Sequence, residues 1–203
     1  MSWIQTYSMG RFYYDERMKE SDVRLIDIVH ALSHINRYGG HTVHPYCVAQ
    51  HSVNASKLPW LSTREARLAV LFHDAHEAYC GDVVNPLKMF LQDYKEAEDT
   101  IQQLVLERFG LASIMEEYAG EVKIADRHAL YLESEYVLKG GRLDGWMSFE
   151  DVEHLPTEGF NVAYWTPLDA RYGFLRRVCE LTGEFSHLHI LARETLAKET
   201  LTR

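Results

Sequence analysis

Apolar residues recur at intervals of three and four along most of this chain, and this spacing constrains the fold more than any other feature. In the range 22–37 they fall on one face of a helix, with Ser21 or Asp22 as the candidate cap. The glycine pair at 39–40 predicts the end of this helix, because glycine readily adopts the left-handed backbone found there. Comparable patterns predict further helices in the ranges 46–57, 92–109, 119–139, 168–182 and 186–201. The sequence therefore predicts an all-α fold.

A capping sequence opens one more helix. Ser62 is predicted to be its cap, with Glu65 three positions later, as in a capping box. The apolar run that follows leads directly to His73. Two ranges break the helical pattern. Residues 82–86 are predicted to form a loop, and residues 140–167 an irregular segment or a short hairpin.

Length and composition favour one globular domain spanning residues 1–203. Apolar residues make up 46% of the chain and charged residues 25%, which is ordinary for a globular protein. The formal net charge of −9 argues against a nucleic-acid polymer as partner, because such binders usually carry a basic surface. A small anionic substrate is still compatible with this charge, since a bound cation can dominate a pocket.

Cysteine content and hydropathy bear on the compartment. The three cysteines are too few and too scattered for a disulfide framework, which is typical of a reducing compartment. No stretch approaches the roughly 18 apolar residues of a membrane span, and the first ten residues do not resemble a signal peptide. We therefore expect a cytoplasmic protein with no membrane partner.

The adjacent pair His73 and Asp74, at the end of an apolar helix, is the strongest indication of chemistry. An upstream His51 and a downstream Asp126 complete a possible site of two histidines and two aspartates. Imidazole nitrogen and carboxylate oxygen together suit a divalent ion such as Zn, Co, Mn, Ni or Fe. Spacing alone leaves a metal site and a buried ion pair equally open, because a buried carboxylate needs a partner in either case.

These four residues, in this order and on three predicted helices, resemble the HD-domain phosphohydrolases. The stretch HDAHEAYCGDVVNPLK at 73–88 is similar to one in bacterial 5′-deoxynucleotidases of that superfamily, and VAQHS and KIAD fit the same pattern. The resemblance covers a motif core of about 22–139 and leaves a C-terminal helical extension, 168–203, outside it. It implies one divalent metal ion per subunit, because dinuclear members supply more histidines and the range 75–125 contains only His76. His76 itself is expected to be structural or to support the ligands.

The resemblance also implies roles for five other residues. Glu77 would exchange a proton with the attacking water, whereas a surface glutamate at an exposed helix end is the alternative. Asp82 would assist proton transfer or orient the leaving group, and a simple turn residue is the alternative. Arg37, Lys88 and Lys123 would bind the substrate phosphates, although each alone is more often a solvated surface charge.

The implied substrate is a small nucleotide, and the implied activity is that of a 5′-deoxynucleotidase. Deoxynucleoside triphosphate triphosphohydrolases share the motifs, and RYGGHT after Asn36 departs from the deoxynucleotidase pattern, so release of triphosphate is an open alternative. A catalytically silent nucleotide-binding domain and a helical interaction protein with a structural ion pair are further alternatives. A homo-oligomer is possible through an apolar stripe that core packing would explain equally well: Leu188, Leu191, Ala192 and Leu196.

Overall fold

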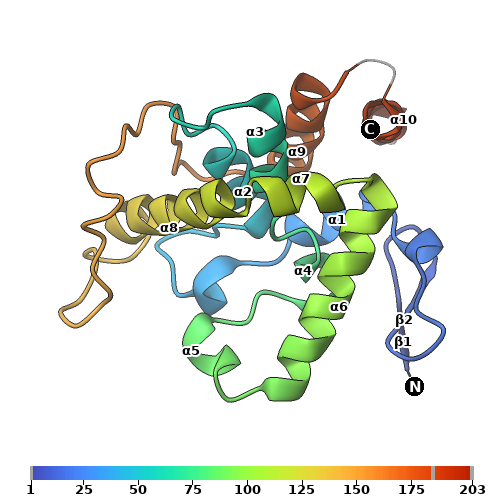
Figure 1. Cartoon of the computed structure of the whole chain (residues 1–203), viewed down its shortest axis with the longest axis horizontal. Coiled ribbons are helices and arrows are strands. Elements are labelled where there is room, and N and C mark those ends of the chain that lie inside the picture. Colours follow the sequence, from blue (N-terminus) through green and yellow to red (C-terminus); the bar gives the residue numbers. More distant parts are fainter. Residues whose placement is uncertain (1, 184–185, 202–203) are drawn as a thin grey trace.

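The protein is mainly helical, as the sequence predicts, in a computed structural model that describes residues 2–183 and 186–201. In Figure 1, α8 lies across the middle of the view, α6 runs along one side of it, and α5 projects below. The helices are α1 (Leu25–Leu32), α2 (Val48–Ala55), α3 (Arg64–Phe72), α4 (Glu77–Cys80), α5 (Asn85–Lys88), α6 (Gln92–Phe109), α7 (Ala112–Glu117), α8 (Ala119–Tyr136), α9 (Pro167–Leu181) and α10 (His187–Leu201), with 3-10 turns at Glu20–Asp22 and Arg37–Gly40.

The main core forms where α9 packs against α1, α2 and α3. Phe174 of α9 is fully buried, and its ring meets that of Phe72 edge to face at a centroid distance of 5.5 Å. Ile28 of α1 and Val53 of α2 are also fully buried in this cluster. The predicted C-terminal extension therefore contributes to the same core as the motif-bearing helices.

Two short antiparallel strands, β1 (Trp3–Gln5) and β2 (Arg11–Tyr13), precede the helices. Their inward residue is Phe12, which is fully buried and stacks on Tyr79 of α4 at 4.1 Å between ring centroids. For the range 140–167, the sequence predicts an irregular segment or a short hairpin. The segment is irregular, and the described residues form no hairpin there.

The first predicted helix ends earlier than its glycines suggested. It stops at Leu32, and Ser33 donates a hydrogen bond from its hydroxyl to the carbonyl of His30 at 2.7 Å. A side chain that binds the carbonyl three residues before it competes with continued helix formation. The glycines still mark a left-handed turn, in which the non-glycine residue Tyr38 also adopts a φ of 58°.

The capping residue of α3 is Thr63, so the prediction of Ser62 is wrong by one position. Thr63 accepts a hydrogen bond from the backbone N–H of Ala66 at 3.0 Å. Ser62 is engaged elsewhere, because its hydroxyl and its N–H both donate to the carboxylate of Glu121 in α8, at 2.7 Å and 3.0 Å. This tertiary contact was not visible in the local pattern.

The irregular segment that follows α8 loops around one end of the molecule (Figure 1) and is held against α2. Gln50 donates hydrogen bonds to the carbonyls of Asn161 and Ala163, at 3.2 Å and 2.7 Å. Asn54 donates to the same Asn161 carbonyl at 2.7 Å. The two α2 amides therefore replace the backbone hydrogen bonds that the segment does not make within itself.

The terminal helix α10 packs against α9 and α1. Leu188 is 5% exposed and Ala192 is fully buried, so the predicted apolar stripe belongs to the core of the single chain. Among the described residues, no helix is both long enough and apolar enough to cross a membrane.

Candidate metal centre

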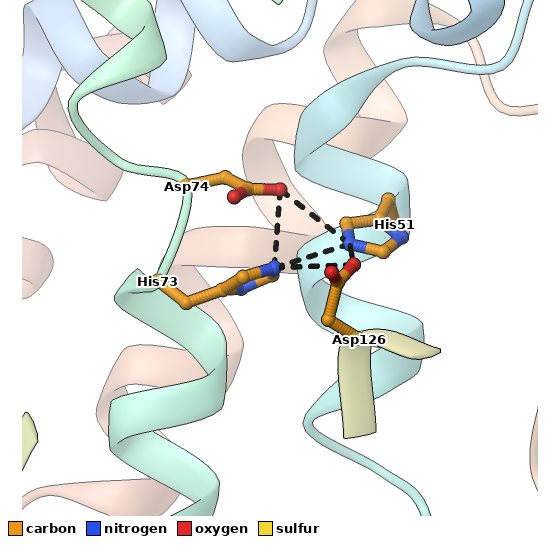
Figure 2. A group of neighbouring side chains, drawn as sticks. All are labelled: His51, His73, Asp74 and Asp126. Atoms are coloured by element: carbon orange, nitrogen blue, oxygen red, sulfur yellow. Dashed lines mark hydrogen bonds and ion pairs between the residues drawn. The ribbon is translucent and has the colours of Figure 1, made fainter. Parts of the chain in front are cut away.

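The four predicted ligands gather at one point from three helices. His51 lies on α2, His73 caps the end of α3, Asp74 lies in the turn that follows, and Asp126 lies on α8. Figure 2 shows the four side chains directed toward one another. One ligand atom from each lies within 4.8 Å of all the others, so the group can hold a metal ion.

The distances between the ligand atoms fit a single small cation. His51 Nε2 lies 3.3 Å from His73 Nε2, 3.5 Å from Asp74 Oδ2 and 3.3 Å from Asp126 Oδ1. His73 Nε2 lies 3.1 Å from the Asp74 oxygen and 3.6 Å from the Asp126 oxygen. Ligand bonds of about 2.0–2.2 Å to a divalent transition metal place neighbouring ligand atoms roughly 3.0–3.5 Å apart. The donor set and its spacing therefore suit such an ion.

Both imidazole rings are fixed so that Nε2 faces the centre. His73 Nδ1 lies 2.7 Å from the carbonyl of Val70, and a carbonyl can only accept, so this nitrogen carries the proton. His51 Nδ1 lies 2.6 Å from the carboxylate of Glu133 and donates to it for the same reason. Each Nε2 therefore has its lone pair free for a cation.

The local electrostatics favour positive charge at the centre. Burial alone lowers the pKa of His73, but the carboxylates of Asp74 and Asp126 outweigh it and raise that pKa well above its usual value. Burial likewise opposes ionisation of Asp126, but the adjacent imidazoles of His51 and His73 hold its pKa well below its usual range. The Asp126 side chain is 45% exposed, so the centre opens to solvent on that side.

Glu77 is buried beside this centre. Its side chain is 4% exposed, which excludes the alternative of a surface residue at an exposed helix end, and its Oε2 has no hydrogen-bond partner among the described residues. Burial, followed by the negative charges of Asp74 and Asp82, raises its pKa well above the usual value. A buried acid with a raised pKa near a metal-binding group is a candidate for proton transfer.

Glu77 belongs to a short helix separate from the one that ends before His73. Helix α3 ends at Phe72, and a turn separates it from α4. The His73 side chain binds the carbonyl of Val70, which the N–H of Asp74 would need in order to continue the helix. The same hydrogen bond from His73 Nδ1 therefore turns the ring toward the centre and ends α3.

Asp82 follows Gly81, whose φ of 84° turns the chain after α4. Its side chain is half-buried, and burial raises its pKa. The charges of Arg37 and Lys88 lower that pKa, and the charge of Asp74 raises it. Asp82 therefore lies within electrostatic range of the centre. The loop that holds it is shorter than the predicted 82–86, because Asn85 and Pro86 already begin α5.

Arg37 contacts the centre directly. Its NH1 lies 3.5 Å from Asp74 Oδ2 and its NH2 4.0 Å from Asp126 Oδ1, and the side chain is 11% exposed. The guanidinium group of Arg37 therefore lies beside the carboxylates of Asp74 and Asp126, where its planar shape suits the binding of a phosphate.

The two predicted lysines differ in their surroundings. Lys88, at the end of α5, makes a 2.6 Å ion pair with Glu98, and the charges of Glu77 and Asp74 also act on it. Lys123 lies one turn before Asp126 on α8, where it is exposed and makes no hydrogen bond or ion pair with the described residues. Of the two, Lys88 has the closer electrostatic link to the centre.

Glu133 was not predicted, although it is tightly bound to the site. It is fully buried, and its Oε1 accepts the proton of His51 Nδ1. Its Oε2 accepts hydrogen bonds from Arg37 Nε at 3.1 Å and from the Tyr38 hydroxyl at 2.8 Å. Its spacing of two helical turns after Asp126 places it on the same face of α8, but that spacing alone does not identify a partner for His51.

Comparison with known proteins identifies two relatives of this chain. The scanned family models do not match the chain. The uncharacterized protein YfdR of Escherichia coli K12 is 38% identical over 183 residues, which cover 90% of this chain and 97% of that protein. The uncharacterized protein RCAP_rcc00048 of Rhodobacter capsulatus is 29% identical over 165 residues, which cover 77% of this chain and 84% of that protein. With this identity over nearly the full length of both chains, the protein belongs to the same family as YfdR.

Proposed function

We propose that this protein is a metal-dependent phosphohydrolase of the HD-domain type, acting on deoxynucleotides. The observation that carries the proposal is the convergence of His51, His73, Asp74 and Asp126 around a point that suits one divalent ion. A structural ion pair would not need both histidine Nε2 atoms turned inward and held there by partners on Nδ1. An ion at this point would acidify a bound water and polarise a phosphoryl oxygen.

The surrounding residues supply what this reaction needs from the protein. The guanidinium group of Arg37, next to the two aspartates, would bind and orient the substrate phosphate. Glu77 would accept a proton from the attacking water, since its Oε2 has no hydrogen-bond partner in the part of the chain that the structure describes. Asp82, on the turn that follows α4, would return a proton to the leaving group.

The presence of Glu77 favours an enzyme over a silent nucleotide-binding domain. A binding site gains nothing from burying an acid beside two other carboxylates, because that arrangement costs free energy. The substrate proposed first is a deoxynucleoside 5′-monophosphate, which would yield orthophosphate. A deoxynucleoside triphosphate that yields triphosphate is the alternative substrate of the same centre.

Product analysis tests the proposal. The purified protein is incubated with mono-, di- and triphosphates of all four deoxynucleosides and with Mn, Co or Zn, and orthophosphate and triphosphate are measured separately. Orthophosphate from a monophosphate supports the first substrate, and triphosphate from a deoxynucleoside triphosphate replaces it with the alternative. Metal binding without either product contradicts the enzyme and leaves a binding domain. Asp126→Ala serves as the inactive control, and Asp151→Ala is a matched exposed aspartate outside the centre.

A further inference from the structure

A second group of metal-type ligands lies outside the four-residue centre. His76, Cys80 and Glu98 each offer one ligand atom, and these atoms lie within 4.8 Å of one another. His76 is 6% exposed, Glu98 is 9% exposed, and Cys80 is half-buried. None of the three belongs to the centre described above, although α4 connects the two groups.

The fold brings these side chains together through one short helix and one long one. His76 is the N-terminal cap of α4 and Cys80 is the last residue of this helix, so the two residues lie one helical turn apart. Glu98 comes from α6, which packs against α4, and its Oε1 lies 3.4 Å from His76 Nε2. That separation is what two ligands of one tetrahedral ion require, at roughly 3.3–3.5 Å.

The polar atoms of this group are incompletely satisfied. His76 Nε2 faces Glu98, and its Nδ1 is buried without a hydrogen-bond partner among the described residues, so no described group fixes which ring nitrogen carries the proton. The Cys80 thiol donates to the carbonyl of His76 at 3.4 Å and also interacts with the side chain of Tyr94. The carboxylate of Glu98 receives the Lys88 ammonium at 2.6 Å. Glu98 is therefore already paired with one cation, the Lys88 ammonium, and the imidazole of His76 and the thiol of Cys80 lie beside this pair.

We infer that His76, Cys80 and Glu98 form a second cation site, selective for Zn²⁺, in which the metal competes with Lys88 for Glu98. One nitrogen, one sulfur and one oxygen ligand make a donor set typical of zinc, and three protein ligands leave one position open. Thiolate coordination distinguishes this site from the first centre, whose ligands are nitrogen and oxygen alone.

Binding at this site involves two exchanges. The Cys80 thiol loses its proton to solvent as the sulfur–metal bond forms, which a zinc ion can drive even though burial raises the pKa of this thiol to about 12. The Glu98 carboxylate exchanges the Lys88 ammonium for the metal, and no electron is transferred. Lys88 is then released beside Glu77 and Asp74, whose charges already act on it. If the proposed function holds, Lys88 becomes available to the substrate phosphate, and zinc would regulate the enzyme.

Cobalt titration tests the site without any nucleotide, so its result is independent of the proposed function. Cobalt bound to a thiolate gives an intense near-ultraviolet charge-transfer band, which nitrogen and oxygen ligands do not produce. We expect this band in the wild-type protein, retained in Cys179→Ser and lost in Cys80→Ser, and bound zinc to fall by one equivalent per chain in Cys80→Ser. Cys179 is the matched half-buried cysteine. A titration without the band, or a band that persists in Cys80→Ser, overturns the inference.

Replacing the competing lysine gives a second test with a specific sign. In Lys88→Met the charge-assisted hydrogen bond to Glu98 is gone, so zinc should bind the second site about tenfold more tightly. Lys123→Met, an exposed lysine without such a partner, should leave the affinity unchanged. Equal or weaker zinc binding in Lys88→Met contradicts the competition, whether or not the protein hydrolyses nucleotides.

Discussion

Glu133 offers the sharpest test of how the metal centre is held together. Its fully buried carboxylate accepts the proton of His51 Nδ1 with one oxygen and binds Arg37 and Tyr38 with the other. Replacing it with glutamine keeps the size and removes the charge. The amide oxygen can still accept hydrogen bonds where one carboxylate oxygen stood. The NH₂ group that replaces the other oxygen faces a donor, either His51 or the pair of Arg37 and Tyr38, and cannot accept from it.

The expected loss follows from the contact with His51. A hydrogen bond to a charged group contributes about 1.5–3 kcal/mol, and the Glu133–His51 bond is short, at 2.6 Å, and fully buried. Because that bond fixes the ring that presents Nε2, most of its loss should appear as weaker metal binding. The dissociation constant of the metal should therefore rise about 10–100-fold. Loss of a hydrogen-bond partner of a metal-binding histidine typically has an effect of this size.

Competition with a chromophoric chelator measures that constant directly. Glu135→Gln is the matched control, because Glu135 lies on the same helix, is exposed and pairs with Arg142. Tyr38→Phe removes a different hydrogen bond to the same carboxylate, so it should lower folding stability by about 1 kcal/mol and leave the metal affinity nearly unchanged. If folded Glu133→Gln binds metal within twofold of the wild-type protein, the positioning argument is refuted.

Three further predictions concern catalysis, pH and folding. Glu77→Ala should keep its bound metal and lose about 10²–10⁴-fold in turnover, as metal analysis and steady-state kinetics on one preparation would show. His30 has a pKa lowered to about 4 by burial and by the positive charges of His34 and Arg171, so the unfolded chain binds its proton more tightly. Because the ring is partly exposed and solvent screens these charges, the free energy of unfolding should fall by about 1–2 kcal/mol, less than the full shift implies, as the pH drops from about 6.5 to about 4, and His30→Gln should remove that part of the loss in denaturant titrations. Thr63→Ala should cost about 1 kcal/mol of stability by the same method, because it removes the cap of α3.

Each of these predictions has a contradicting result. Loss of metal in Glu77→Ala would make that residue a ligand. A pH profile of His30→Gln that parallels the wild-type profile would remove the cause assigned to His30, and His41→Gln is its control, because His41 is exposed and is not among the charges that act on His30. A free energy of unfolding for Thr63→Ala equal to that of the wild-type protein would contradict Thr63 as the cap.

The helices were predictable where their own side chains determine them. The range 92–109 matches α6 at both ends, because its apolar period and the glycine that follows are local features. The ends at Leu32 and Phe72 were not predictable from periodicity. At both, a polar side chain takes a carbonyl that the next turn would need.

The four candidate ligands of the centre could be picked out from the sequence, but the residue that orients His51 could not. His51, His73, Asp74 and Asp126 carry a recognisable order, and the structure places them together. Glu133 has no such signature, because its importance depends on the packing of α8 against α2, which joins residues 82 positions apart in the sequence.

Restoration of activity by metal tests the central claim most directly. The protein is treated with a chelator, and the release of orthophosphate or triphosphate from deoxynucleotides is measured before and after one divalent metal is added back. The account predicts that the wild-type protein recovers its rate and that Asp126→Ala, which lacks a ligand, does not. A rate that survives chelation, or that Asp126→Ala recovers as fully as the wild-type protein, would contradict a hydrolytic metal centre at these four residues.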